Sequence, residues 1–300
     1  MALAAAVSHA APPAKPTAAE VLQASRADDW RPLDPGRTLL MQLGATGDAK
    51  GGEVLIELAP RFAPRHVANI LTLVRERYFD GLAVLRVQDN YVAQWGDPEA
   101  ESAEKARPLG QAERKLPAEF EVPLRGLPLS RLPDVDGWAQ VTGWVDGFAV
   151  AADPRANRAW LAHCYGVVGA GRDNPADSSN GTELYAVIGH APRGLDRNIT
   201  VVGRVLSGID LLSSLPRGGA NMGFYDQPEQ RLAIRSVRVL DELPPDQRPA
   251  LQVLRTDTAT WRALLEARRN RREPWFVHRS GHIGLCNATV PTRPAPKPAS

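Results

Sequence analysis

The sequence predicts a mainly β protein organised around one small barrel. Short segments rich in β-branched and apolar residues alternate with turns, and the 26 prolines and 25 glycines are spread among these segments instead of forming repeats. Two amphipathic helical segments accompany the expected strands, at residues 64–76 and at about residues 208–215. A chain of 300 residues can bury one such core and still carry extensions.

The barrel is expected to begin with a hairpin. Residues 38–43 and 53–58 are apolar or alternate with β-branched side chains, and GATGDAKGG between them has the composition of a turn. Pro64 then occupies the favoured first turn of a helix, in which apolar residues from Val67 to Val74 recur at i, i+3, i+4 and i+7. One face of this helix should therefore pack against the barrel core.

Two further strands are predicted in the stretch YFDGLAVLRVQDNYVAQWGDP, which occupies residues 78–98. A turn at YFDG leads into strands at residues 82–87 and 91–94, which a short QDN turn connects. Arg86 and Gln94 lie on these neighbouring strands. The apolar residues on both sides of Arg86 argue against a merely solvated charge at this position.

The order of these blocks resembles the cyclophilin-type peptidyl-prolyl cis-trans isomerases. The matching blocks are, in chain order, GGEVLIELAPRFAPRHVANILTLV, YFDG, VLRV, QWGDP, GVVGAGRDNPADSSNGTELYAVIGHAP, LDRNITVVGRVLSGIDLL and the final strand-like LAIRSVRVL. They cover roughly residues 38–99 and 162–240, about half of the chain. A series of ordered blocks is more specific than any single motif.

The resemblance implies a closed eight-stranded antiparallel cyclophilin-like barrel, capped by two helices, with a substrate groove on its outer face. It also implies an enzyme, a peptidyl-prolyl isomerase that acts on proline-containing peptide segments or unfolded proteins without a cofactor or a metal. Amide resonance opposes rotation about an X-Pro bond with a barrier of about 18–20 kcal/mol, and no covalent bond has to break. We expect the protein to be a monomer.

Two residues take the catalytic positions by this resemblance. Arg86 matches the family's catalytic arginine, and Gln94, eight residues later, matches the glutamine that hydrogen-bonds the substrate and the arginine. Arginine suits the reaction because it stays charged and offers a planar fork of donors to the carbonyl and the imide nitrogen of the twisted bond. The expected substrate-binding residues are Val84, Tyr91, Val92, Glu183, Leu184, Tyr185, Leu195 and Ile199.

The expected pocket wall departs from the family pattern. Val-Leu-Arg at residues 84–86 stands where Phe-His-Arg is common, Glu-Leu-Tyr at residues 183–185 replaces Gln-Phe-Phe, and Ile199 replaces a histidine. The family's tryptophan beside Leu-Asp has no counterpart, because Arg193 and Gly194 precede that pair. These changes keep an alternative open, a catalytically weak or silent cyclophilin-like module that binds or scaffolds peptides.

The acidic residue of this wall, Glu183, allows two arrangements. Facing the groove, its carboxylate would pair with Arg86 and either orient the guanidinium or compete with the substrate carbonyl for its donors. In the other arrangement the side chain points to solvent and leaves Arg86 alone.

The cyclophilin-like domain is expected at residues 37–243, with an insertion at about residues 123–161. The insertion is too aromatic for a free linker, so we expect it to fold. Its large aromatic residues are Trp138, Trp144, Phe148 and Trp160. The insertion either extends the peptide-binding surface or docks a partner, or it buries these side chains against the barrel and the C-terminal extension.

Both ends of the chain carry extensions. Residues 18–36 form an N-terminal extension with a short helix, and residues 244–300 form a C-terminal extension with a helix at about residues 257–271 and a disordered tail. The basic run at the end of this helix either contacts an anionic surface or complements the helix dipole.

The N-terminus and the two cysteines bear on the compartment. Residues 1–17 resemble the end of a secretory signal, with a small-x-small site SHA before a Pro/Ala linker. We therefore expect a periplasmic or secreted protein, the alternative being a cytoplasmic protein with a disordered tail. Cys164 and Cys286 permit one disulfide in an oxidising compartment but fit two unpaired thiols equally well.

Several other classes of function find no support. The net charge of +2, from 36 basic and 34 acidic residues, gives no large basic field for nucleic acid. No apolar run approaches the roughly 20 residues that span a bilayer. The sequence lacks a nucleophile elbow, HExxH, a P-loop and a dinucleotide fingerprint. His278, His282 and Cys286 share a four-residue spacing, but intervening glycines argue against a helical metal site.

Overall fold

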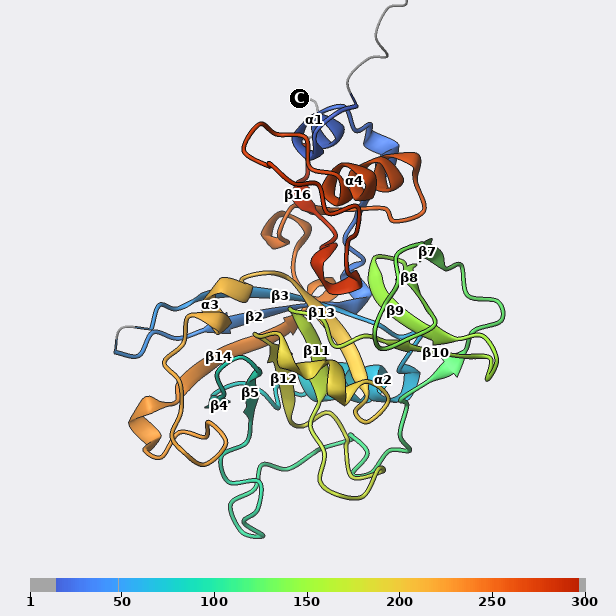
Figure 1. The fold of residues 1–300 in the computed structure, drawn as a ribbon. Helices are drawn as coiled ribbons and strands as arrows, with labels where there is room; N and C mark the ends of the chain where they lie inside the picture. Colours follow the sequence, from blue (N-terminus) through green and yellow to red (C-terminus); the bar gives the residue numbers. More distant parts are fainter. Residues whose placement is uncertain (1–14, 48, 297–300) are drawn as a thin grey trace, which may run out of the picture.

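Eight antiparallel strands close into a barrel in the computed structural model, which describes residues 15–47 and 49–296 (Figure 1). In the order in which neighbours pair, they are β11 (Val167–Ala170), β12 (Leu184–Val187), β5 (Val92–Gly96), β4 (Ala83–Val87), β14 (Leu232–Val239), β2 (Thr38–Leu43), β3 (Gly52–Leu58) and β13 (Val201–Ser207). Closure leaves the barrel without a free sheet edge. The predicted fold class is confirmed.

The first hairpin forms as its local pattern predicts. Strands β2 and β3 pair without a register shift from Thr38 opposite Glu57 to Leu43 opposite Gly52. Side chains alternate between the two faces of each strand, so every second apolar residue enters the barrel core. Those on β2 and β3 are Leu39, Met41, Leu43, Val54, Ile56 and Leu58.

Two helices pack against the barrel core. Helix α2 (Pro64–Arg75) begins at its proline and buries its apolar stripe, including Ile70 and Leu73, in the barrel core. Helix α3 (Ile209–Ser213) is one short turn that buries Leu212 in the same core. Both helices lie within the segments that the sequence predicts for them.

The insertion folds as a separate five-stranded sheet beside the barrel (Figure 1). Its strands, in pairing order, are β6 (Val122–Pro123), β10 (Arg158–Leu161), β9 (Phe148–Asp153), β8 (Val141–Val145) and β7 (Ser130–Leu132). Trp144, Phe148 and Trp160 are buried, whereas Trp138 is 59% exposed. Most of the aromatic residues of the insertion therefore serve to anchor it.

The two terminal extensions, which we expected to be separate segments, fold together. Strand β1 (Trp30–Pro32) pairs with β15 (Leu251–Leu254), which pairs with β16 (Thr292–Pro294). Helices α1 (Ala18–Gln23) and α4 (Ala259–Arg269) lie beside each other at the same end of the molecule (Figure 1).

The expectation of a disordered tail is wrong for β16. The main chain of Thr292–Pro294 pairs with β15, and the Arg293 guanidinium lies 4.2 Å from the ring centroid of Trp30. Any extended segment can pair with a strand edge through main-chain hydrogen bonds. The composition of residues 292–294 therefore does not predict that they form a strand. The signal-like residues 1–14 and the last four residues lie outside the described part of the chain.

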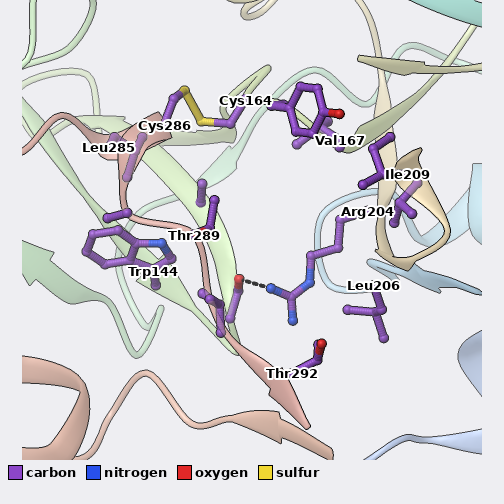
Figure 2. A pocket seen from close by; sticks show the side chains of 17 residues that line it. Trp144, Cys164, Val167, Arg204, Leu206, Ile209, Leu285, Cys286, Thr289 and Thr292 are labelled. Atoms are coloured by element: carbon purple, nitrogen blue, oxygen red, sulfur yellow. Dashed lines mark hydrogen bonds between the residues drawn. A yellow bond between two sulfur atoms is a disulfide. The ribbon is translucent and has the colours of Figure 1, made fainter. Parts of the chain in front are cut away.

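A disulfide joins the barrel to the C-terminal extension. Cys164, just before β11, bonds Cys286, which is 122 residues away along the chain. Figure 2 shows this bond beside a cavity of about 230 Å³, lined by Trp144 of the insertion, Leu285 of the extension and Arg204 of β13. The bond also explains Cys286 without a metal.

Within the described residues, no helix is long and apolar enough to cross a membrane.

We predict that replacing both cysteines, Cys164→Ser with Cys286→Ser, lowers the free energy of unfolding by about 2–5 kcal/mol. The physical reason is that the unfolded chain gains the conformational freedom of a loop of more than a hundred residues. Urea unfolding of the wild type with and without reductant measures the effect, and the double variant, which reductant should not change, is the control. An unchanged urea midpoint in the double variant would refute a stabilising role.

Candidate functional site

Arg86 and Gln94 meet across β4 and β5. The register of this strand pair shifts between Val84 and Arg86, so Leu85 is an extra residue in β4. Such a β-bulge turns the following side chain to the opposite face. Arg86 therefore lies outside the barrel opposite Gln94, and its Nη1 donates a hydrogen bond of 3.0 Å to Gln94 Oε1.

Four further groups hold the Arg86 side chain. Its Nε donates to the main-chain carbonyl of Met222 at 2.7 Å, and Nη2 donates to Gln88 Oε1. The rings of Tyr91 and Phe224 lie 5.7 and 5.3 Å from the guanidinium carbon, within the range of cation–π attraction. Only 8% of Arg86 is exposed. Burial lowers its pKa, yet a guanidinium remains charged at ordinary pH.

Two donors of Arg86 remain free for a ligand. An arginine side chain carries five N–H groups. Among the described residues, Met222, Gln94 and Gln88 accept three of them, which leaves one N–H on each Nη. The site thus presents an oriented pair of charged donors.

Glu183 adopts neither of the two arrangements expected from the sequence. Gln94 Nε2 donates a 2.9 Å hydrogen bond to Glu183 Oε2, so the carboxylate acts on Arg86 through the amide of Gln94. An ionised carboxylate only accepts hydrogen bonds, which directs the Gln94 oxygen towards Arg86. Burial raises the pKa of Glu183 above its ordinary value. A Cβ at Gly96 would lie 2.6 Å from Glu183 Cγ, so this glycine makes room for the carboxylate.

Two of the expected groove residues point the other way. Val84 is 0% exposed and Leu184 is 2% exposed, and both belong to the barrel core. Leu184 precedes the outward Tyr185 on β12 and therefore faces inward. Val84 faces inward because the bulge at Leu85 places it and Arg86 on opposite faces of β4. Their assignment to the substrate groove is therefore wrong.

Four of the five other apolar residues expected in the wall belong to the core outside the barrel or pack against it. Val92 and Tyr185 are buried there, and Tyr91 and Ile199 are half-buried against it. Leu195, at the end of η3 (Ala191–Leu195), is half-buried. The same core contains Trp160 and Leu161 of the insertion, so the insertion sheet supports the wall from behind.

A buried polar chain fixes Tyr185, and the sequence does not predict it. The Tyr185 hydroxyl lies 2.9 Å from His163 Nε2, and His163 Nδ1 lies 3.1 Å from Asp196 Oδ1. The carboxylate accepts a hydrogen bond from Nδ1–H, and the imidazole tautomer with this proton accepts the hydrogen bond of the tyrosine hydroxyl at Nε2. The ring of Tyr185 also covers Gly169, where a Cβ would come within 2.2 Å of the hydroxyl oxygen.

Asp196 connects the hydrogen-bonded series Tyr185–His163–Asp196 to the insertion. Trp160 Nε1 donates to Asp196 Oδ2 at 3.3 Å, and Arg193 Nε donates to the same oxygen at 2.8 Å. Burial alone would raise the pKa of Asp196, but the hydrogen bond from His163 and the charge of Arg193 outweigh it and hold the pKa below its ordinary value. The tyrosine of the wall thus rests on an ionised, fully bonded support.

Sequence reasoning missed four residues of this site. Gln88 and Phe224 contact Arg86 through their side chains, Met222 through its carbonyl, and His163 holds Tyr185. The glycine-rich segment at residues 218–224 is the one local signal, because repeated glycines allow the tight turns that bring Met222 to Arg86. His163 has no local signal, since its partners lie 22 and 33 residues away.

Comparison with known proteins identifies relatives of the whole barrel. The family model "Cyclophilin type peptidyl-prolyl cis-trans isomerase/CLD" matches residues 41–239, more than half of the chain. "Probable peptidyl-prolyl cis-trans isomerase" of Brucella suis is 28% identical over 198 residues, which are 66% of this chain and 81% of the relative. "Peptidyl-prolyl cis-trans isomerase-like 1" of Gibberella zeae is 24% identical, over 64% of this chain and 91% of that protein.

A solved structure resembles the chain beyond the barrel. The cyclophilin AquaCyp293 from Hirschia baltica superposes with a TM-score of 0.69 at 26% sequence identity. The superposition covers 89% of this chain and 95% of the other. This share is larger than the barrel alone, so the likeness includes parts of the insertion and the extensions.

We predict that Glu183→Gln stabilises the protein at neutral pH relative to the wild type. A carboxyl whose pKa is higher in the folded than in the unfolded chain binds a proton more tightly when folded, so its stability contribution is lost as pH rises through the raised pKa. The glutamine oxygen still accepts from Gln94 but carries no buried charge.

Urea unfolding of both proteins at pH about 4 and about 7 tests this sign. The advantage of Glu183→Gln should shrink at the acidic pH, where the wild-type carboxyl is protonated. Glu104→Gln, at an exposed position, is the matched control. A variant that is less stable than the wild type at neutral pH would contradict the prediction.

Proposed function

Because the chain belongs to the cyclophilin-type peptidyl-prolyl cis-trans isomerases, we propose that it rotates X-Pro bonds by a non-covalent route in which Arg86 assists. The substrate is a proline-containing segment of an unfolded or exported polypeptide. The observation that carries the proposal is the charged donor pair of Arg86, oriented by Gln94 and free to meet a ligand.

The reaction requires the imide bond to lose its resonance. In the twisted state, the nitrogen lone pair is no longer shared with the carbonyl and becomes a hydrogen-bond acceptor. The free N–H groups of Arg86 would donate to this nitrogen and to the neighbouring carbonyl oxygen, and the first of these bonds exists only in the twisted state. Interactions of this kind accelerate the reaction, about tenfold for each 1.36 kcal/mol.

The proline ring needs an apolar surface beside these donors. Tyr91 lies against Arg86, and Tyr185 is held rigidly on the neighbouring strand. Together with Val92 they would form one side of the proline site, because apolar contact fixes the ring while the preceding residue rotates. Glu183 keeps Gln94 in the orientation that Arg86 requires.

One observation supports a second candidate, a peptide-binding module with weak catalysis. Tyr185 is only 3% exposed, and Arg86 is enclosed by two aromatic rings and three acceptors. A site this enclosed would bind proline segments at the surface of the wall but would hold the rotating bond less closely. Both candidates bind the peptide at the outer face of β4, β5 and β12, and they differ in the rate of isomerisation.

Replacing Arg86 separates the candidates. We predict that Arg86→Ala and Arg86→Lys each lower kcat/KM for X-Pro peptides about 100-fold or more, as for the loss of one preorganised donor to a transition state. Isomerisation rates on a panel of peptides that differ in the residue before proline measure this effect. Arg235→Ala, at an exposed position of β14, is the matched control and should keep the wild-type rate.

The second candidate makes the opposite prediction. If wild type and Arg86→Ala both show the uncatalysed rate while calorimetry still detects peptide binding, the chain is a binding module. Rates of the wild type far above the uncatalysed rate, unaffected by Arg86→Ala, would instead refute the role of Arg86.

We further propose that the protein assists the folding of exported proteins. The disulfide supports this proposal, because such bonds persist in oxidising compartments and are rare in the cytosol. We predict that fractionation of the native host finds the protein in the periplasm or the medium, with a new N-terminus after the SHA site detected by mass spectrometry. A full-length product in the cytosol would contradict export.

A further inference from the structure

The C-terminal extension presents a loop whose tip is both apolar and basic. This loop, residues 270–282, follows α4 and is called the basic loop below. At its tip Trp275 is 82% exposed and Val277 is 101% exposed. Apolar side chains of this size are normally buried on folding, so this exposed pair, together with the charges around it, is a candidate docking surface.

Positive charge surrounds this tip. The basic loop contains Arg271, Arg272 and Arg279 and a single acidic residue, Glu273. Its net charge of +2 equals that of the whole 300-residue chain, so the remaining residues are neutral in sum. The loop therefore carries an excess of positive charge next to Trp275 and Val277.

The fold holds the base of the loop in place. Asp134 of the insertion accepts hydrogen bonds from Arg269 Nε at 3.0 Å, just before the loop, and from the Ile283 main-chain N–H at 3.0 Å, just after it. Ser280 Oγ donates to the carbonyl of Arg269 at 3.1 Å. A loop with both ends fixed to one buried carboxylate loses less conformational freedom when it binds.

Contacts within the loop orient its tip. The Phe276 N–H donates to the carbonyl of Glu273 at 3.0 Å, which forms a turn. The Phe276 ring lies 4.9 Å from the Trp275 ring and 5.0 Å from the Arg271 guanidinium carbon. Phe276 is half-buried between these two side chains, whereas Trp275 and Val277 are exposed.

We propose that the basic loop docks the protein on an anionic lipid surface. Tryptophan is favoured at the boundary between headgroups and acyl chains, and an aliphatic residue beside it adds apolar contact. Arginines close to such a surface are attracted by its negative potential. The exposed aliphatic Val277 favours lipid over nucleic acid, whose bases stack on aromatic rings.

The position of the loop is compatible with isomerase activity. Figure 1 shows α4, from which the loop continues, at the end of the molecule away from β4 and β5. Docking through the loop would therefore place β4 and β5, which carry Arg86 and Gln94, at the far end from the lipid surface.

Co-sedimentation of the full chain with lipid vesicles tests the proposal. We predict binding to vesicles of phosphatidylcholine with phosphatidylglycerol, weaker binding at high salt, and little binding to phosphatidylcholine alone. Replacing Trp275 and Val277 together with serine should weaken binding at least tenfold. Each of Arg271→Gln, Arg272→Gln and Arg279→Gln should weaken it about fivefold.

The chain offers a matched control. Val135 and Trp138 of the insertion are a second exposed valine and tryptophan, at 84% and 59%, and their double serine variant should bind vesicles like the wild type. Isomerase rates and circular dichroism confirm that the variants fold. Equal binding by the wild type and the Trp275/Val277 variant would overturn the proposal, as would failure of the wild type to bind anionic vesicles or binding to duplex DNA instead.

Discussion

Alternation of side chains along the closed barrel is the constraint on which the site depends. Every strand position faces either the packed interior or the outer surface, and a shift of one residue exchanges the two. The bulge at Leu85 makes this exchange within β4, so Val84 stays in the core while Arg86 reaches the outer face. In a regular strand, residues 84 and 86 would share a face, and the charge of Arg86 would be buried in the barrel core without partners.

The outer face is stabilised by parts of the chain that are distant in sequence. The carbonyl of Met222 fixes Arg86 from the segment before β14, and Asp196 with His163 fixes Tyr185. Through Trp160, the insertion contributes to this support. The disulfide and the edge-to-face contact between Trp144 and Trp261, at 4.9 Å, then join the insertion and the barrel to the C-terminal extension.

Elements with a strong local pattern could be predicted, and contacts between distant segments could not. The hairpin of β2 and β3 and the helix α2 follow from alternation, turn residues and a helical repeat within about twenty residues each. The assignment of Leu184 to the groove failed because it ignored the alternation of side chains along β12. The assignment of Val84 failed because no sequence pattern indicated the bulge at Leu85. β16 was missed because its pairing uses main-chain groups that every residue has.

The sequence by itself determined the barrel family, the two capping helices and the presence of Arg86 and Gln94 at a spacing of eight residues. These features are local or follow the order of motifs along the chain, so hydrophobic periodicity and motif order predict them directly. Only the tertiary structure decided which face Arg86 occupies, that Glu183 acts through Gln94, that the two cysteines pair, and that strands of the two extensions share one sheet. Each of these outcomes is a contact between segments whose proximity exists only after the barrel has closed.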